Sequence, residues 1–186
     1  MKPVLVGAAL TAVALLEAAI PAGAASGEPE VDATCVRTLH GTFDRPVGPV
    51  RGNAPQADTL HMTGTVTCVD PTGRSVAAGT VDHTVTLPRT ECTGDEHGDT
   101  LTTRVTWADG GTSTLSFEHI DVIKAAGTAS LVATGAVTSD SARFAGDALR
   151  AVGTSVGTGC GTSAGARKVD STTVIRLTHR PGPATG

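Results

Sequence analysis

Aromatic residues are scarce in this chain of 186 residues, which contains one tryptophan, three phenylalanines and no tyrosine. Ligand pockets are lined mainly by apolar and aromatic side chains. The shortage of aromatic residues therefore argues against a wide ligand cavity. It favours a thin core built from valine, leucine and alanine.

Clusters of basic residues and long apolar runs are also missing from most of the chain. The 14 lysines and arginines are scattered among 18 acidic residues, and the formal net charge is −4. A nucleic-acid interface needs clustered cations to neutralise phosphates, so we expect no nucleic-acid partner. No run of about 18 apolar residues follows the N-terminal segment, so we also expect no membrane partner for the mature chain.

The N-terminal segment has the features of a secretory signal peptide. Lys2 supplies a positive charge, Val4–Leu16 is apolar or neutral, and Pro21–Ala25 adds a turn and small residues. We expect cleavage after Ala24 or Ala25. The sequence thus predicts a secreted, extracellular protein.

The rest of the chain is long enough for one domain with its own core. We expect a signal peptide over 1–25, a disordered leader over 26–32, a single β domain over 33–179 and a disordered tail over 180–186. Short polar and Pro/Gly-rich ends of this kind are rarely ordered.

Four cysteines remain after the signal peptide, at Cys35, Cys68, Cys92 and Cys160. An even number in an exported chain is typical of disulfides. Metal sites built from cysteine use closely spaced pairs, and every spacing here exceeds 20 residues. We therefore expect two disulfides, no metal site and no cofactor.

Apolar and polar residues alternate along much of the chain, which predicts β-strands with one wet face. Between Asp58 and Cys68, for example, Leu60, Met62 and Val66 share one face, and threonines occupy the other. The same pattern predicts strands over Thr34–Phe43, Asp58–Cys68, Ala77–Leu87, Thr100–Trp107, Thr112–Ile123, Thr128–Thr138, Arg143–Val152 and Ser171–Thr178.

About eight strands joined by short turns leave no room for crossover helices. The fold class predicted is all-β, an antiparallel meander closed as a narrow or flattened barrel, with a β-sandwich as the alternative. Ala108–Gly111 is predicted to form a hairpin turn. At Glu118-His119 the alternation of apolar and polar residues shifts by one position, which predicts a β-bulge. We expect Trp107 and Phe117 to pack as an aromatic pair across this hairpin.

The meander also predicts which cysteines pair. With strands that alternate in direction, Cys35 and Cys68 lie at one end of the barrel, whereas Cys92 and Cys160 lie at the other. Partners must have Cα atoms within about 7 Å, which a full strand length excludes. We therefore predict Cys35–Cys68 and Cys92–Cys160.

Several strand and turn motifs resemble those of a known group. They are Val105–Thr114 (VTWADGGTST), Gly135–Ser139 (GAVTS), Arg143–Asp147 (RFAGD) and Cys160. In these motifs the chain is similar to a group of small secreted, four-cysteine, β-barrel-like proteins of actinomycete bacteria. The resemblance covers most of the mature chain and departs at 140–142, where the group tends to have glycine. It implies secretion and a β fold, and it implies no activity.

One catalytic pattern is present but lacks its structural context. Gly161–Gly165 matches GxSxG around Ser163, and Asp170 and His179 follow in the order used by α/β-hydrolases. That motif needs a strand–turn–helix, whereas a Gly-rich loop and a strand flank this one. A second match at Gly153–Gly157 shows how readily this composition produces the pattern. We predict no catalytic site.

Other polar residues raise the question of a cation site. Asp95–Asp99 (DEHGD) could offer oxygen ligands but lacks the calcium-loop pattern, so we interpret it as a solvated hairpin tip. His40 and His61 are expected on the wet face of the first hairpin, where two imidazoles make a weak site. His83 falls on an apolar face, which predicts a hydrogen-bonded core residue.

These observations leave several functional classes. The favoured hypothesis is a non-enzymatic extracellular binding or structural module with an extracellular or cell-wall partner. The alternatives are a secreted hydrolase with an unrecognised site and a protease inhibitor that uses Arg89–Thr93 as its reactive loop. A deep pocket with converging polar groups would favour a ligand carrier or hydrolase, whereas a filled interior would favour a surface binder.

Overall fold

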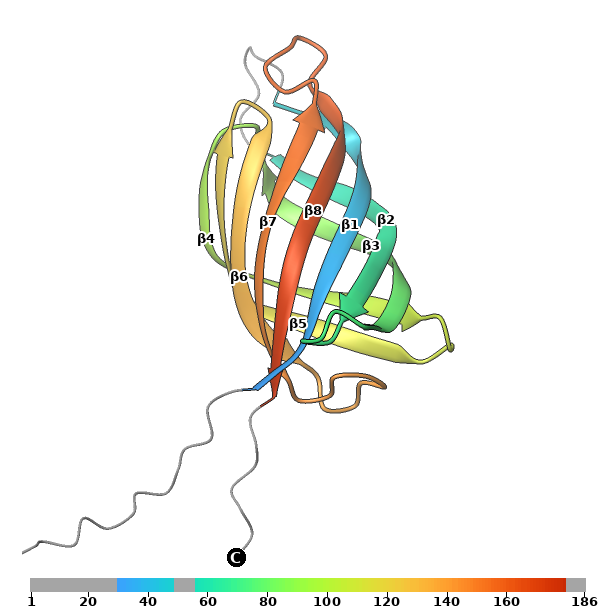
Figure 1. Cartoon of the computed structure of the whole chain (residues 1–186). Coiled ribbons are helices and arrows are strands. Elements are labelled where there is room, and N and C mark those ends of the chain that lie inside the picture. The colour runs from blue at the N-terminus through green and yellow to red at the C-terminus, as the bar shows by residue number, and fades with distance from the viewer. Residues whose placement is uncertain (1–29, 49–55, 180–186) are drawn as a thin grey trace, which may run out of the picture.

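The structure is a computed structural model that describes residues 30–48 and 56–179 (Figure 1). The expected signal peptide and tail lie outside the described residues, as does the expected leader up to residue 29. Glu30–Asp32, also assigned to the leader, instead form the start of the first strand. Among the described residues there is no helix with the length and hydropathy of a membrane span.

The described residues form a closed antiparallel barrel of eight strands, in which each strand pairs with the next and β8 returns to β1. This confirms the predicted fold class, and the barrel replaces the sandwich alternative. The strands are β1 (Glu30–Val47), β2 (Gln56–Val69), β3 (Ser75–Thr90), β4 (Gly94–Trp107), β5 (Thr112–Ala125), β6 (Thr128–Val137), β7 (Ala148–Thr158) and β8 (Ala166–His179).

Both predicted disulfides are present. Cys35 and Cys68 occupy opposed positions on β1 and β2, with Cα atoms 3.9 Å apart. Cys92 and Cys160 join the β3–β4 and β7–β8 connections at the opposite end, with Cα atoms 5.6 Å apart. We call the end where β1 begins and β8 ends the closed end. The end that carries Cys92–Cys160 is the open end, at the top of Figure 1.

The predicted aromatic pair is wrong. Trp107 and Phe117 are both buried, but Phe117 lies opposite Leu101 in the β4–β5 register. The ring that packs against Trp107 is that of Phe144, with centroids 5.9 Å apart and an interplanar angle of 74°. The sequence pattern predicts a strand over Arg143–Val152 that includes Phe144, but β7 begins only at Ala148.

Phe144 lies in a turn because the chain reverses there in the left-handed region, with φ of 58° at Phe144 and 83° at Gly146. This conformation folds the phenyl ring back over the closed end. Phe144 is therefore a partly buried turn residue packed against the core, and not a strand residue as predicted.

The core is concentrated at the closed end. Alternation along the strands directs their apolar side chains inward there, as expected for a half-buried strand. The buried residues of this half include Ala33, Cys35, Trp107, Leu115, Val137, Leu149, Ile175 and Leu177.

One seam of the barrel is nearly unpaired. β3 and β4 pair only at Gly79–Trp107 and Thr80–Thr106, although their ends are joined by the short connection 91–93. Beyond these pairs the strands separate, and a groove of about 510 Å³ lies between them. We call this groove the window; its lining includes His83, Val85, Thr100, Leu101, Phe117 and Glu118.

The predicted β-bulge is confirmed. The β5–β6 register shifts between Phe117 and His119, and the β4–β5 register shifts on either side of Asp99. One extra residue reverses which side chains face inward. This reversal determines the polar lining of the open half.

Candidate functional site

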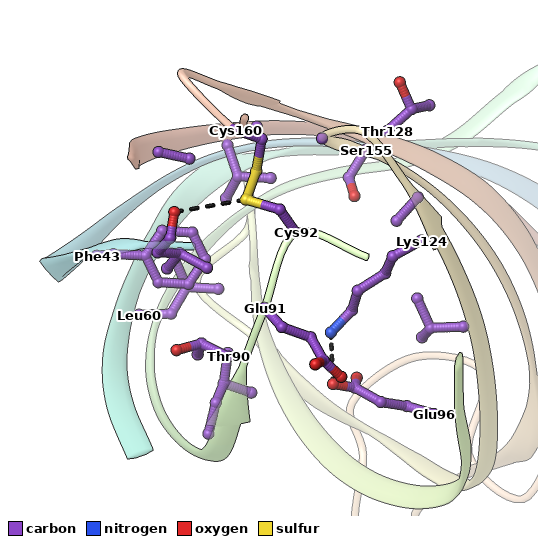
Figure 2. Close-up of a pocket in the computed structure, with 18 of the residues that line it drawn as sticks. Phe43, Leu60, Thr90, Glu91, Cys92, Glu96, Lys124, Thr128, Ser155 and Cys160 are labelled. Carbon is purple, nitrogen blue, oxygen red and sulfur yellow. Dashed lines mark hydrogen bonds and ion pairs between the residues drawn. A yellow bond between two sulfur atoms is a disulfide. The ribbon is translucent and has the colours of Figure 1, made fainter. Parts of the chain in front are cut away.

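The open half of the barrel holds a cavity of about 250 Å³ (Figure 2). Residues of all eight strands and of the connections at this end form its wall. Most of that wall is apolar, with Phe43, Val47, Leu60, Leu87, Val122, Ala129, Ala166 and Val169 among its members. The barrel is therefore neither filled throughout nor lined by many aromatic rings.

An ion pair lies inside this apolar wall. Lys124 Nζ donates to Glu96 Oε1, and the two side chains are only 16% and 23% exposed. Figure 2 shows Lys124 and Glu96 reaching from the wall toward each other, and Glu91 extends into the same part of the cavity. Arg89 Nη2 lies 3.1 Å from Glu91 Oε2. The cavity thus presents paired charges rather than a net excess of one sign.

The bulges explain why Lys124 and Glu96 point inward. Before the bulge in β5, the inward residues are Leu115 and Phe117, at odd positions. After it, Val122 and Lys124 line the cavity from even positions. The irregular register of β4 likewise turns Glu96 toward the interior. Glu96 and Lys124 therefore meet across the adjacent strands β4 and β5.

The rim of the cavity is held by covalent and backbone contacts. The Cys92–Cys160 disulfide crosses it. The Gly127 amide donates to the Cys92 carbonyl oxygen at 3.3 Å, and the Gly157 amide donates to the Gly127 carbonyl oxygen at 2.6 Å. These bonds tie three connections of the open end together, so the cavity is preformed.

Between the open half and the packed closed half lies a layer of buried polar side chains. Arg37 projects from β1 and is 5% exposed. Its Cζ atom lies 5.3 Å from the centre of the Phe117 ring, and Nη2 donates to Thr173 Oγ1 over a long 3.4 Å. Burial lowers the pKa of Arg37 to about 10, which leaves it cationic at neutral pH.

His83 belongs to this layer but is not the hydrogen-bonded residue predicted. Its Nε2 atom is buried without a protein hydrogen-bond partner in the described part of the chain. Burial, and secondarily the charge of Arg37, lowers the pKa of His83. The imidazole is therefore neutral at neutral pH, and Arg37 carries the charge of this layer.

A separate buried carboxyl group lies at the closed end. Asp147 is 1% exposed, and the pKa of this group is raised by burial and by Asp32, against the opposing effect of His179. His179 Nδ1 lies 3.1 Å from Asp147 Oδ1. This carboxyl group lies at the opposite end of the barrel from the cavity and is not part of its lining.

The structure does not assemble the GxSxG residues. Ser163 lies in the β7–β8 connection at the open end, where the chain forms turns and no helix follows. Asp170 faces outward, with its Oδ1 atom 2.6 Å from His40 Nδ1. His179 lies at the other end of β8 and contacts Asp147. These three residues therefore form no triad.

The acidic segment Asp95–Asp99 is not a hairpin tip, because it belongs to β4. Glu96 turns into the cavity, whereas His97 faces outward, with Nδ1 3.1 Å from Asp121 Oδ1. His40 and His61 also have separate partners, Asp170 and Asp44. In the described ranges, no group of three or more such side chains could hold a metal ion.

The segment considered as an inhibitor loop forms part of the cavity wall. Arg89 and Thr90 end β3, and only 91–93 connect it to β4. Thr90, Glu91 and Cys92 are half-buried. The segment lies beside a disulfide, as an inhibitor loop would, but its side chains take part in the cavity.

Sequence reasoning missed the two most informative residues, Arg37 and Lys124. Arg37 lies in the inward phase of its strand between Cys35 and Leu39, so alternation alone marks it as a buried cation. Lys124 could have been found by carrying the predicted bulge through to the end of its strand.

Comparison with protein-family models, with curated proteins and with solved structures found no match for this chain. A functional assignment therefore depends on the geometry of the barrel itself. Its principal features are the cavity at the open end, the window and the buried Arg37 between them.

Proposed function

We propose that this chain is a secreted, non-enzymatic binding protein that holds one small, largely apolar molecule in the open half of its barrel. The observation that supports this proposal is the preformed cavity, whose apolar wall contains one ion pair. Such a combination of apolar lining and a few placed polar groups is typical of ligand sites.

The size of the cavity restricts the ligand. Pockets for drug-sized molecules span about 300–1,000 Å³, and this one is smaller, at about 250 Å³. We therefore infer a compact ligand, such as a short-chain or small aromatic compound, and not a long lipid.

The ion pair restricts the chemistry of the ligand. Lys124 supplies a donor and Glu96 an acceptor within one small region. A neutral group that both donates and accepts, such as an amide or an alcohol, can satisfy both partners without adding an unpaired charge to a largely apolar cavity. The preferred ligand is thus apolar with one neutral polar end.

Secretion is supported by two features. Disulfides persist in oxidising compartments, and both pairs are formed here. The first 25 residues also carry the signal-peptide pattern. We expect the exported protein to begin at Ala25 or Ser26, as determined by N-terminal sequencing. Recovery of a membrane-bound form that retains Met1 would contradict this.

The binding proposal can be tested with N-phenyl-1-naphthylamine, an uncharged fluorescent probe whose emission rises in apolar surroundings. The mature protein should bind it saturably. Ala129→Phe places a large ring in the cavity and should weaken probe binding at least tenfold, because Ala129 lines the wall.

The matched control is Val132→Phe, which adds a similar ring on the outer face of the same strand, where Val132 is 43% exposed. This variant should bind the probe like the parent. Absence of saturable binding by the parent, or equal loss in both variants, would show that the cavity is not the site.

A further inference from the structure

The buried layer contains a cation without a counter-ion. Among the described residues, no carboxylate lies within 4.0 Å of the Arg37 guanidinium. Its Nε atom is buried and has no hydrogen-bond partner in the described chain. A buried charge is strongly destabilising unless it is paired, so a folded protein that keeps one has a use for it.

Two further polar groups of the barrel are also unsatisfied. His83 Nε2 and Thr103 Oγ1 are buried without partners in the part of the chain that the structure describes. They project from β3 and β4, the two strands that border the window. With Arg37 Nε, three buried polar atoms of the described residues on β1, β3 and β4 therefore have unused hydrogen-bonding capacity, and such atoms are rare in folded proteins.

The window leads from solvent to this layer. His83 and Phe117 belong to its lining. Phe117 also lies under the Arg37 guanidinium, and the Arg37 charge acts on His83. Arg37 itself does not line the window, but a molecule that enters between β3 and β4 would meet His83 and Phe117, the two lining residues that lie near Arg37.

We propose that Arg37 is the anchor of an anion site, which binds the carboxylate of a small organic anion that enters through the window. The Nε–H and one terminal N–H of an arginine match the two oxygens of a carboxylate. The long contact to Thr173 leaves the guanidinium free to form this pair. Val85, Leu101 and Phe117 provide apolar contacts for the rest of the molecule.

This site is independent of the cavity proposed above, because the two share no lining residue. One group opposes it: Glu118 lines the window and is exposed, so its charge repels an approaching anion. His83 is neutral and presents a hydrogen-bonding nitrogen. The attraction therefore comes from Arg37.

The test is a titration of the mature protein with sodium octanoate, followed by the Nε–H signals of its arginines in two-dimensional NMR. The Arg37 Nε–H signal should shift saturably, and sodium chloride at equal ionic strength should not reproduce the shift. Arg37→Met should lower octanoate affinity at least tenfold, whereas Arg176→Met, which removes an exposed arginine of β8, should not.

Three further variants keep the result interpretable. Arg37→Lys retains the charge but not the two-pronged geometry, and should lower affinity severalfold even if Arg37→Met fails to fold. Glu118→Gln should raise affinity about twofold. Ala129→Phe should leave octanoate binding at Arg37 unchanged, which separates this site from the cavity.

Unaltered octanoate affinity in a folded Arg37→Met or Arg37→Lys protein would overturn the proposal. So would a titration in which the Arg37 signal does not move. Tighter binding of inorganic phosphate than of octanoate would also overturn it, because the site would then select a small inorganic anion.

Discussion

Individual buried polar residues of this barrel differ in how well they are satisfied. Asp58 is 5% exposed, and its carboxylate accepts from the backbone amides of Arg45 at 3.3 Å and Thr59 at 2.8 Å. It is thus a structural carboxylate that holds two strands together. Asp147 and Arg37 instead each keep a buried polar atom that has no hydrogen-bond partner among the described residues.

Asp147 should make stability depend on pH. Burial is the largest cause of its raised pKa, so the folded protein holds the proton to a higher pH than the unfolded chain does. As pH rises from about 4, the unfolded chain loses its proton first. The stability that Asp147 contributes is therefore present at low pH and is lost as pH rises through the raised pKa.

We predict that Asp147→Asn raises the free energy of unfolding at pH 7 by about 1 kcal/mol, the scale of an unsatisfied buried polar group. The difference from the parent should shrink toward pH 4, as measured by chemical denaturation at several pH values. Asp82→Asn on the exposed face of β3 is the control and should show no such trend. A difference that grows as pH falls would contradict the assignment.

At the scale of the elements, the bulge in β5 requires close approach of β6. A Cβ atom added at Gly135 would lie 1.9 Å from the Ser116 carbonyl oxygen and 3.0 Å from Phe117 Cα. Both contacts are to backbone, which cannot move without breaking the β5–β6 ladder. The glycine is therefore needed for space at this position.

We predict that Gly135→Ala lowers the free energy of unfolding by roughly 3 kcal/mol, because overpacking against backbone cannot relax. Gly157→Ala is the matched control on β7, since its added Cβ would meet its nearest neighbours at 3.5 Å, an ordinary contact. That variant should differ from the parent by less than about 1 kcal/mol. Thermal or urea denaturation of the two proteins distinguishes these outcomes, and equal stability would contradict the close approach.

At the scale of the whole molecule, the two disulfides lie near opposite ends of the barrel, one in each half. Cys35–Cys68 joins the adjacent strands β1 and β2 in the packed half, and Cys92–Cys160 joins two connections at the rim of the cavity. The sequence separations are 33 and 68 residues. Each link restricts the unfolded chain, and the longer loop gains slightly more.

We predict that replacing either pair by serine lowers the free energy of unfolding by roughly 3–5 kcal/mol. The two double variants should differ in binding. Loss of Cys92–Cys160 should weaken binding of N-phenyl-1-naphthylamine, because that disulfide lines the cavity. Loss of Cys35–Cys68 should leave binding intact at temperatures where the protein remains folded. Equal effects on binding would contradict this division between the halves.

Much of this architecture could be predicted from local pattern. Alternation located the strands because side chains of a strand alternate between its two faces whatever the strand pairs with. Short turns between the strands require neighbouring strands to be antiparallel. The alternating strand directions alone then place two cysteines at each end of the barrel. The bulge at Glu118-His119 also appeared as a slip in that local pattern.

Only the tertiary structure decided what those elements enclose. Phe144 reaches Trp107 through a left-handed turn, and Lys124 meets Glu96 because register shifts on two adjacent strands reverse their inward phase together. The separation of β3 from β4 likewise depends on how all eight strands tilt and close around the barrel. The alternation of apolar and polar residues determines on which face of the sheet a side chain lies. Whether that face meets packed side chains, a cavity or an unpaired arginine depends on residues far away in the chain.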